Sequence, residues 1–126
     1  MPRTSKAEAE LASENPVLTA RRSELDHFTV EFTDFHIDAD GTPAFMGLPD
    51  DRCQCTHWGY VVAGEFTLRY ADGDETYKEG DAYLARPGHV PVVTTGTQLV
   101  EFSPTEQLAK TIAVLEANMA AMGEQS

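Results

Sequence analysis

The sequence predicts an all-β sandwich or barrel that is followed by one C-terminal helix. Between His27 and Phe102, short runs of alternating apolar and polar residues are separated by turns rich in Gly, Pro and Asp. Roughly six to nine short strands at such close spacing are typical of sandwiches and barrels. After residue 103 the apolar residues recur with the period of a helix. With 126 residues, the chain has room for one compact domain.

The first 16 residues are polar and rich in Ala, Glu, Ser and Lys. This composition predicts a flexible or partly helical tail over 1–16. The β-barrel is then predicted over 17–103. Its first clear strand begins near His27, where Phe28, Val30 and Phe32 alternate with polar residues and therefore face one side of a sheet.

The central part of the chain predicts a hairpin. The strand that starts near His57 runs into a turn at 63–65, and an alternating apolar pattern resumes from Phe66 to Tyr70. Further short strands follow, and they are separated by turns at 71–74, 79–81 and 87–91.

The chain ends in a predicted helix over 104–126. Ser103 stands at the N-cap, Pro104 at the first helical position and Glu106 at the third, which together form a capping box. An apolar stripe marks the face that packs against the core or another subunit, and it consists of Leu108, Ile112, Leu115 and Met119.

The balance of charge excludes several classes of partner. Lys and Arg number 9 against 21 Asp and Glu, which gives a formal net charge of −12 and a pI near 4.5. Such a chain repels nucleic acids and anionic membrane surfaces. The sequence has no apolar run long enough to span a bilayer, and residues 1–16 lack the apolar stretch of a secretion signal. We therefore expect a cytoplasmic protein.

Three residues of types that commonly bind metals are spaced by two in the segment RCQCTHWGYVVAGE. They are Cys53, Cys55 and His57, and on a β-strand all three side chains would face the same side. Two cysteines in a reducing compartment favour metal or redox chemistry over a disulfide framework. On a flat strand the three residues would span about 13–14 Å, so a shared ion requires a bend or bulge near Cys53 or Cys55.

The same segment resembles the first motif of the cupins, small jelly-roll barrels that often hold one metal ion. That motif is usually His-x-His, three or four residues, Glu, six residues and Gly. Gly64 fits the final Gly, and His57 stands where the Glu is expected. Cys53 and Asp51 stand at the second and first His, whereas Cys55 has no counterpart in the pattern.

A second stretch, EGDAYLARPGH, resembles the second cupin motif. Gly80 and Gly88 match its glycines, Pro91 stands where the His is expected, and His89 lies two residues earlier. A shift of two keeps a strand side chain on the same face, so His89 can still point inward. The two stretches are similar to those of small bacterial cupin-domain proteins, and the resemblance covers residues 17–104. It implies a cupin jelly-roll β-sandwich barrel.

The donor side chains predict one transition metal ion bound by Cys53, Cys55, His57 and His89, and the resemblance to cupins supports a bound metal. Two thiolates and two imidazoles suit tetrahedral zinc best, and iron or copper also accept such donors. If three residues bind the ion, water fills the fourth position and the site can be catalytic. If all four bind, the site is closed and structural. The alternative is that both cysteines are small buried hydrophobes and both histidines are core residues.

Several polar residues are expected around the barrel cavity. Glu101 is the candidate acid or base because it is the only carboxylate in an apolar run, and Tyr70 is a candidate for proton transfer or substrate orientation. By the same pattern, Trp58 and Tyr60 face outward from His57. Residues that could also orient a substrate are Tyr60, Tyr83 and Arg86.

Three functions remain open on this basis. The chain is a metal-dependent enzyme acting on an organic small molecule, a non-catalytic metal or ligand sensor, carrier or accessory protein, or a metal-free barrel with an apolar pocket. The resemblance also implies a homodimer, because cupins commonly pair through their sheets and the C-terminal stripe leaves a spare apolar face.

Overall fold

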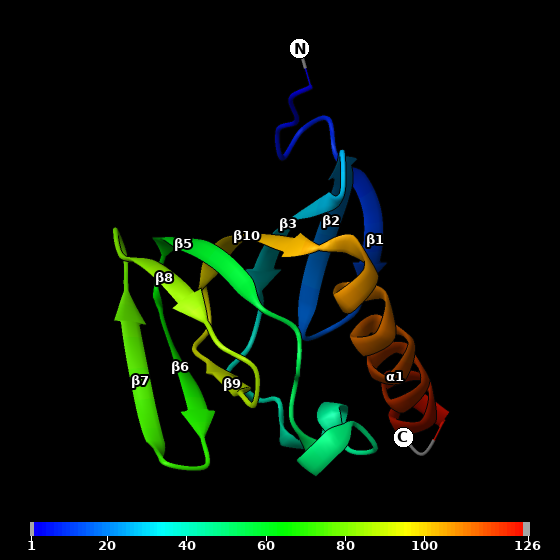
Figure 1. Cartoon of the computed structure of the whole chain (residues 1–126), viewed down its shortest axis with the longest axis vertical. Helices are drawn as coiled ribbons and strands as arrows, with labels where there is room; N and C mark the ends of the chain where they lie inside the picture. The colour runs from blue at the N-terminus through cyan, green and yellow to red at the C-terminus, as the bar shows by residue number, and fades with distance from the viewer. Residues whose placement is uncertain (1, 125–126) are drawn as a thin grey trace.

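The computed structural model describes residues 2–124 and shows two antiparallel sheets followed by one helix (Figure 1). The six-stranded sheet has the order β1-β2-β3-β10-β5-β8, and the four-stranded sheet has the order β4-β9-β6-β7. The predicted sandwich with a C-terminal helix is therefore confirmed. The strands are β1 (Glu10–Glu14), β2 (Leu18–Leu25), β3 (Phe28–Phe35), β4 (Ala39–Asp40), β5 (His57–Ala63), β6 (Glu65–Tyr70), β7 (Gly73–Lys78), β8 (Ala82–Ala85), β9 (Val90–Val93) and β10 (Gln98–Pro104).

A hydrophobic core fills the space between the two sheets. Strand β6 shows its origin, because Phe66 and Leu68 are buried while Thr67 and Arg69 on the alternate positions are not. We call this cluster the sheet core; it consists of Val61, Phe66, Leu68, Tyr70, Tyr83, Ala85, Val93 and Leu99.

The predicted hairpin at 63–65 is wrong, because β5 and β6 lie in different sheets. The chain crosses between the sheets at Gly64, whose φ of +82° is accessible to glycine at little cost. A Cβ at Gly64 would lie only 2.6 Å from Oγ1 of Thr97, so the crossing also needs the missing side chain. The hairpin instead forms between β6 and β7, with Tyr70 paired to Gly73.

The N-terminal residues differ from the expected tail. Strand β1 pairs with β2 in antiparallel register from Glu10 to Glu14, with an irregularity between Leu11 and Ser13. Its side chains are mostly exposed, so the strand carries little of the apolar alternation that identifies strands in a sequence. Backbone pairing to β2, which the sequence does not report, holds it at the edge of the sheet.

Helix α1 (Thr105–Glu124) follows β10 directly and packs beside the larger sheet, on the opposite side of the molecule from the β6–β7 hairpin (Figure 1). Leu108, Ile112 and Leu115 from the predicted stripe contact buried residues, as expected. The last two residues of the predicted helix, Gln125 and Ser126, lie outside the described residues. Within 2–124, no helix combines the length and apolar character needed to cross a membrane.

Candidate metal centre

Cys53 lies in an irregular segment before β5, not on a strand as the sequence pattern suggested. A 3₁₀ turn, η2 (Pro49–Asp51), precedes it and includes left-handed residues at Asp50 (φ 58°) and Asp51 (φ 54°). The backbone then pairs with the loop before β9: the Cys53 amide donates to the His89 carbonyl at 2.9 Å, and the Gly88 amide donates to the Cys53 carbonyl at 2.7 Å. This pairing brings Cys53 beside His89.

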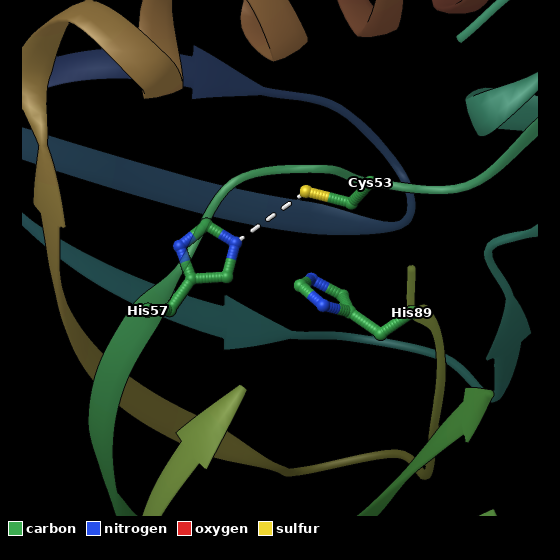
Figure 2. Close-up of side chains that lie close together, drawn as sticks. All are labelled: Cys53, His57 and His89. Carbon is green, nitrogen blue, oxygen red and sulfur yellow. Dashed lines mark hydrogen bonds between the residues drawn. The ribbon is translucent and has the colours of Figure 1, made fainter. Parts of the chain in front are cut away.

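Cys53 and His57 lie on one stretch that leads into β5, His89 comes from the loop before β9, and the three side chains point toward one another (Figure 2). One donor atom from each lies within 4.8 Å of the others, and all three residues are buried. Sγ of Cys53 is 3.6 Å from Nε2 of His57. Sulfur and nitrogen donors on one tetrahedral zinc ion are separated by about the same distance, roughly 3.6 Å, given the usual bond lengths. The cluster therefore fits a single metal ion.

Both imidazoles are oriented through their Nδ1 atoms. Nδ1 of His57 lies 2.6 Å from the hydroxyl of Ser103, and Nδ1 of His89 donates to the Arg86 carbonyl at 2.6 Å. Metal-binding histidines in proteins are held in this way, with one ring nitrogen engaged by the protein and the other left for the ion. The arrangement leaves Nε2 of each ring as the donor.

Electrostatics favour the ionised thiol. Burial by itself raises the pKa of the Cys53 thiol, but hydrogen bonds and positive charge from His57 and His89 outweigh it and lower the pKa from 9.0 to about 6. Burial by itself lowers the pKa of His57, whereas the charge of Glu101 and the thiols of Cys53 and Cys55 raise it well above 6.5. A thiolate, the form that binds metals, is thus stabilised at neutral pH.

Cys55 is not part of this cluster, although the sequence predicted it as a ligand. Its thiol donates to the Thr56 carbonyl at 3.5 Å, and the residue is only 1% exposed. It packs with apolar side chains, as expected for a small buried hydrophobe. Because residues 53–56 do not form a regular strand, the two-residue spacing does not bring the Cys55 sulfur into the group formed by Cys53, His57 and His89, although Cys55 still contributes to the raised pKa of His57.

Cys53 and Cys55 belong to a second buried cluster, which we call the site cluster. It joins the irregular loops to helix α1 and consists of Phe45, Leu48, Cys53, Cys55, Val90 and Leu108. Asp51 stands at the first His of the cupin motif, but it is not one of the three clustered metal donors. Its carboxylate instead accepts a hydrogen bond from the Gly47 amide at 2.9 Å.

Glu101 faces the barrel interior beside His57. Tyr83 donates its hydroxyl proton to Glu101 at 2.6 Å, and burial together with the charge of Glu101 raises the pKa of Tyr83. Gly59 makes room for this contact, since a Cβ there would lie 2.3 Å from the Tyr83 ring. Glu101 therefore acts on the centre through its charge on His57, and its carboxylate is held by Tyr83.

Tyr70 supports the loop that carries His89. Its hydroxyl accepts a hydrogen bond from the Arg86 amide at 2.9 Å, and its ring lies edge-on to His89 with 6.2 Å between ring centroids. The Arg86 guanidinium lies 4.7 Å from the Tyr70 ring centroid. These contacts fix the position of His89 and make Tyr70 a positioning residue.

Two residues near the centre escaped the sequence analysis. Ser103 was assigned to the helix N-cap, yet its hydroxyl contacts His57, and Pro104 still belongs to β10. Thr111 on α1 places Oγ1 3.8 Å from Sγ of Cys53. Both residues look ordinary in the sequence, because their role depends on the docking of β10 and α1 against a loop far away in the chain.

A groove of about 590 Å³ lies between β1, β2 and the start of α1. None of the three clustered residues lines it. Its walls are a mixture of polar and apolar side chains that include Glu10, Arg22, Glu24 and Leu108. The groove is therefore separate from the candidate metal centre.

Solved structures that are similar to this chain include proteins with the cupin fold. An RmlC-like cupin from Shewanella frigidimarina is 21% identical, with 80% of this chain and 88% of that one covered and a TM-score of 0.57. KdgF from Halomonas sp. is 20% identical over 79% and 90% of the two chains, with a TM-score of 0.56. Ectoine synthase from P. lautus is 12% identical over 83% and 78%, with a TM-score of 0.60.

No protein-family model and no curated protein sequence matches the chain. The structural similarity establishes that the chain has the cupin fold, which confirms the fold expected from the two motifs. At these identities the similarity concerns the fold alone, so the function has to be argued from the candidate metal centre.

Proposed function

We propose that this chain is a metal-binding cupin whose ion is held by Cys53, His57 and His89. The observation that carries the proposal is the convergence of three buried donor atoms within 4.8 Å, with both imidazoles held through Nδ1. One thiolate and two imidazoles suit zinc best, and iron or copper are the alternatives. The two free cysteines favour a reducing compartment, and we place the protein in the cytoplasm.

The bound ion would bind and activate an organic small molecule inside the barrel. Three protein ligands leave a tetrahedral ion one further position, where a carbonyl or hydroxyl oxygen can be polarised. Glu101 is the group suited to proton transfer, since it lies in the barrel beside His57. Similar structures that include an ectoine synthase and a polyketide cyclase support an enzyme of this kind.

A non-catalytic role is the second candidate. The three ligands are at most 8% exposed, and the apolar face of α1 covers the cluster that contains Cys53. A centre so covered suits a sensor or accessory protein that holds its ion tightly.

Metal analysis of the purified protein tests the proposal. The wild-type chain, after zinc reconstitution and desalting, should hold about one equivalent of zinc, and His57→Ala should hold close to none. His27→Ala is the matched control, because His27 is exposed and lies outside the cluster. Equal metal content in the His57 and His27 variants would remove the proposed ligand set.

We also propose a homodimer that forms through the outer face of the six-stranded sheet. As predicted, Trp58 and Tyr60 face outward, 47% and 45% exposed. Trp58 is paired in register with Phe102 and Leu84, so the exposed side chains form one uncharged patch. The patch consists of Phe28, Trp58, Tyr60, Val62, Leu84 and Phe102. Apolar patches of several hundred Å² commonly mark interfaces.

Trp58→Glu tests the dimer by light scattering at micromolar concentration. The wild-type mass should be twice 13.8 kDa, and the variant should have the monomer mass. Leu11→Glu, at an exposed apolar residue on β1, is the control and should remain dimeric. A wild-type protein that is monomeric would contradict the proposal.

A further inference from the structure

Helix α1 contributes one buried hydroxyl, that of Thr111, to the cover of the metal centre. Leu108, Ile112 and Leu115 from α1 pack against the site cluster. Thr111 lies between them in the sequence and is 4% exposed. The side chain of Thr111 is therefore buried against the centre rather than directed to solvent.

The hydroxyl of Thr111 is directed at Cys53. Its Oγ1 lies 3.8 Å from Sγ, on a residue whose thiolate is stabilised by the two imidazoles. Threonine inside a helix commonly bonds to a carbonyl of the preceding turn, but the partner that the structure gives this hydroxyl is the sulfur. A contact of this length is weak as a hydrogen bond, so it does not by itself account for the buried hydroxyl.

The distance between Thr111 Oγ1 and Cys53 Sγ matches that between two ligands of one metal ion. Sulfur and oxygen donors on one tetrahedral zinc ion lie about 3.6 Å apart, given bonds of about 2.3 and 2.1 Å. Thr111 Oγ1 is thus separated from Cys53 Sγ by nearly the same distance as His57 Nε2, which is 3.6 Å away. Cys53, His57 and His89 supply three donors and leave one position unassigned.

We propose that the Thr111 hydroxyl fills the fourth position of the metal ion, so that α1 is part of the metal centre. This inference rests on the proposed metal-binding function. A neutral hydroxyl is a weak donor beside a thiolate and two imidazoles, and a small molecule with a nitrogen or anionic oxygen donor can displace it. Thr111 therefore keeps the site closed until such a ligand takes its place.

Cobalt(II) binding to the full chain tests this role, because cobalt reports the donor atoms of a zinc-type site by its absorption. Thr111→Val keeps the shape of the side chain and removes the oxygen. The variant should bind cobalt about tenfold more weakly and should show a changed visible spectrum. Imidazole at millimolar concentration should shift the spectrum of the variant more than that of the wild type, because the fourth position is then open.

Two controls separate the hydroxyl from packing. Thr111→Ser keeps the oxygen and should retain the wild-type spectrum and affinity, and Ile112→Val removes one methylene from the same face of α1 and should also retain them. If Thr111→Val is poorly folded, Thr111→Ala is measured against Thr111→Ser instead. A cobalt affinity, spectrum and imidazole response equal to wild type in the folded variant would overturn the inference. A wild-type chain that takes up no cobalt would overturn the proposed function as well.

Discussion

The two buried clusters of this protein are built in different ways. The sheet core consists of side chains from paired strands, and the residues of β6 and β9 that contribute to it keep an unbroken register. The site cluster instead joins the 3₁₀ turn η1 (Thr42–Phe45), the irregular segment around Cys53, the start of β9 and helix α1. The sheet core is made mostly of apolar side chains. The site cluster includes Cys53, whose thiol lies beside the imidazoles of His57 and His89.

This difference shows that the metal donors come together where the backbone is irregular. A regular strand separates same-face residues by about 6.5–7 Å, which is too far for three of them to reach one ion. The pairing of Cys53 with His89 across two loops overcomes this limit, because it brings in donors from segments 36 residues apart in the numbering. The sheet core then stabilises the barrel that holds those loops.

The largest expected effect concerns the sheet core. Phe66 is 2% exposed and contacts the rings of Tyr77 and Tyr83. Phe66→Ala should lower the free energy of unfolding by about 3–5 kcal/mol, because it leaves a cavity in a packed core. Urea unfolding gives this value. The fraction that remains folded should still bind one equivalent of zinc; loss of zinc from that folded fraction would show that the two clusters are not separable.

A smaller effect, on zinc affinity, is expected from Ser103→Ala beside the metal centre. The Ser103 hydroxyl orients His57 through Nδ1, so its loss should weaken zinc affinity about 10–100-fold, or about 1.4–2.8 kcal/mol. Competition with a chromophoric chelator measures the affinity. Thr67→Ala, at a partly buried position whose hydroxyl bonds Thr76 on the smaller sheet, serves as the control. Equal affinity in both variants would show that Ser103 plays no part in positioning the ligand.

The pH dependence of zinc affinity should follow the Cys53–His57 pair. With the pKa of Cys53 lowered to about 6 and that of His57 raised, the pair holds one proton between these values, on His57, and a second proton below about pH 6. Zinc displaces these protons, so affinity should rise about tenfold per pH unit above pH 6 and more steeply below it. Chelator competition from pH 5 to 8 measures the slope. A pH-independent affinity would contradict the assignment of this pair as ligands.

The smallest effect is expected at Cys55. Cys55→Ala should change zinc affinity by less than about threefold, because its thiol bonds the Thr56 carbonyl and is not one of the three donors Cys53, His57 and His89. The same chelator competition measures it, with Cys53→Ala as the matched comparison that should lose affinity strongly. Equal losses in the two cysteine variants would restore Cys55 as a ligand.

The sequence predicted most of the sheets because their signal is local. Alternation in β6 and the outward direction of Trp58 and Tyr60 follow from the two-residue period of a strand. Edge strand β1 escaped prediction, because its exposed side chains lack that period. The crossing at Gly64 escaped it as well, since a turn glycine does not reveal whether the next strand joins the same sheet.

The site was predicted only in part for a related reason. Cys53, His57 and His89 have the side chains that bind metals, and the cupin motifs placed them near the barrel. Cys55 shares that chemistry, but its thiol on the irregular backbone after Cys53 donates to the Thr56 carbonyl and does not join the three donor atoms of the metal centre. Ser103 and Thr111 carry only hydroxyls, and their proximity to the centre depends on tertiary packing that no local pattern contains.

A crystal structure of the zinc-reconstituted protein, with anomalous data at the zinc edge, tests the central claim most directly. The account predicts one anomalous peak about 2.3 Å from Sγ of Cys53 and about 2.0–2.1 Å from Nε2 of both His57 and His89. No peak at this position, or a peak bound by Cys55 in place of one of these three residues, would contradict it.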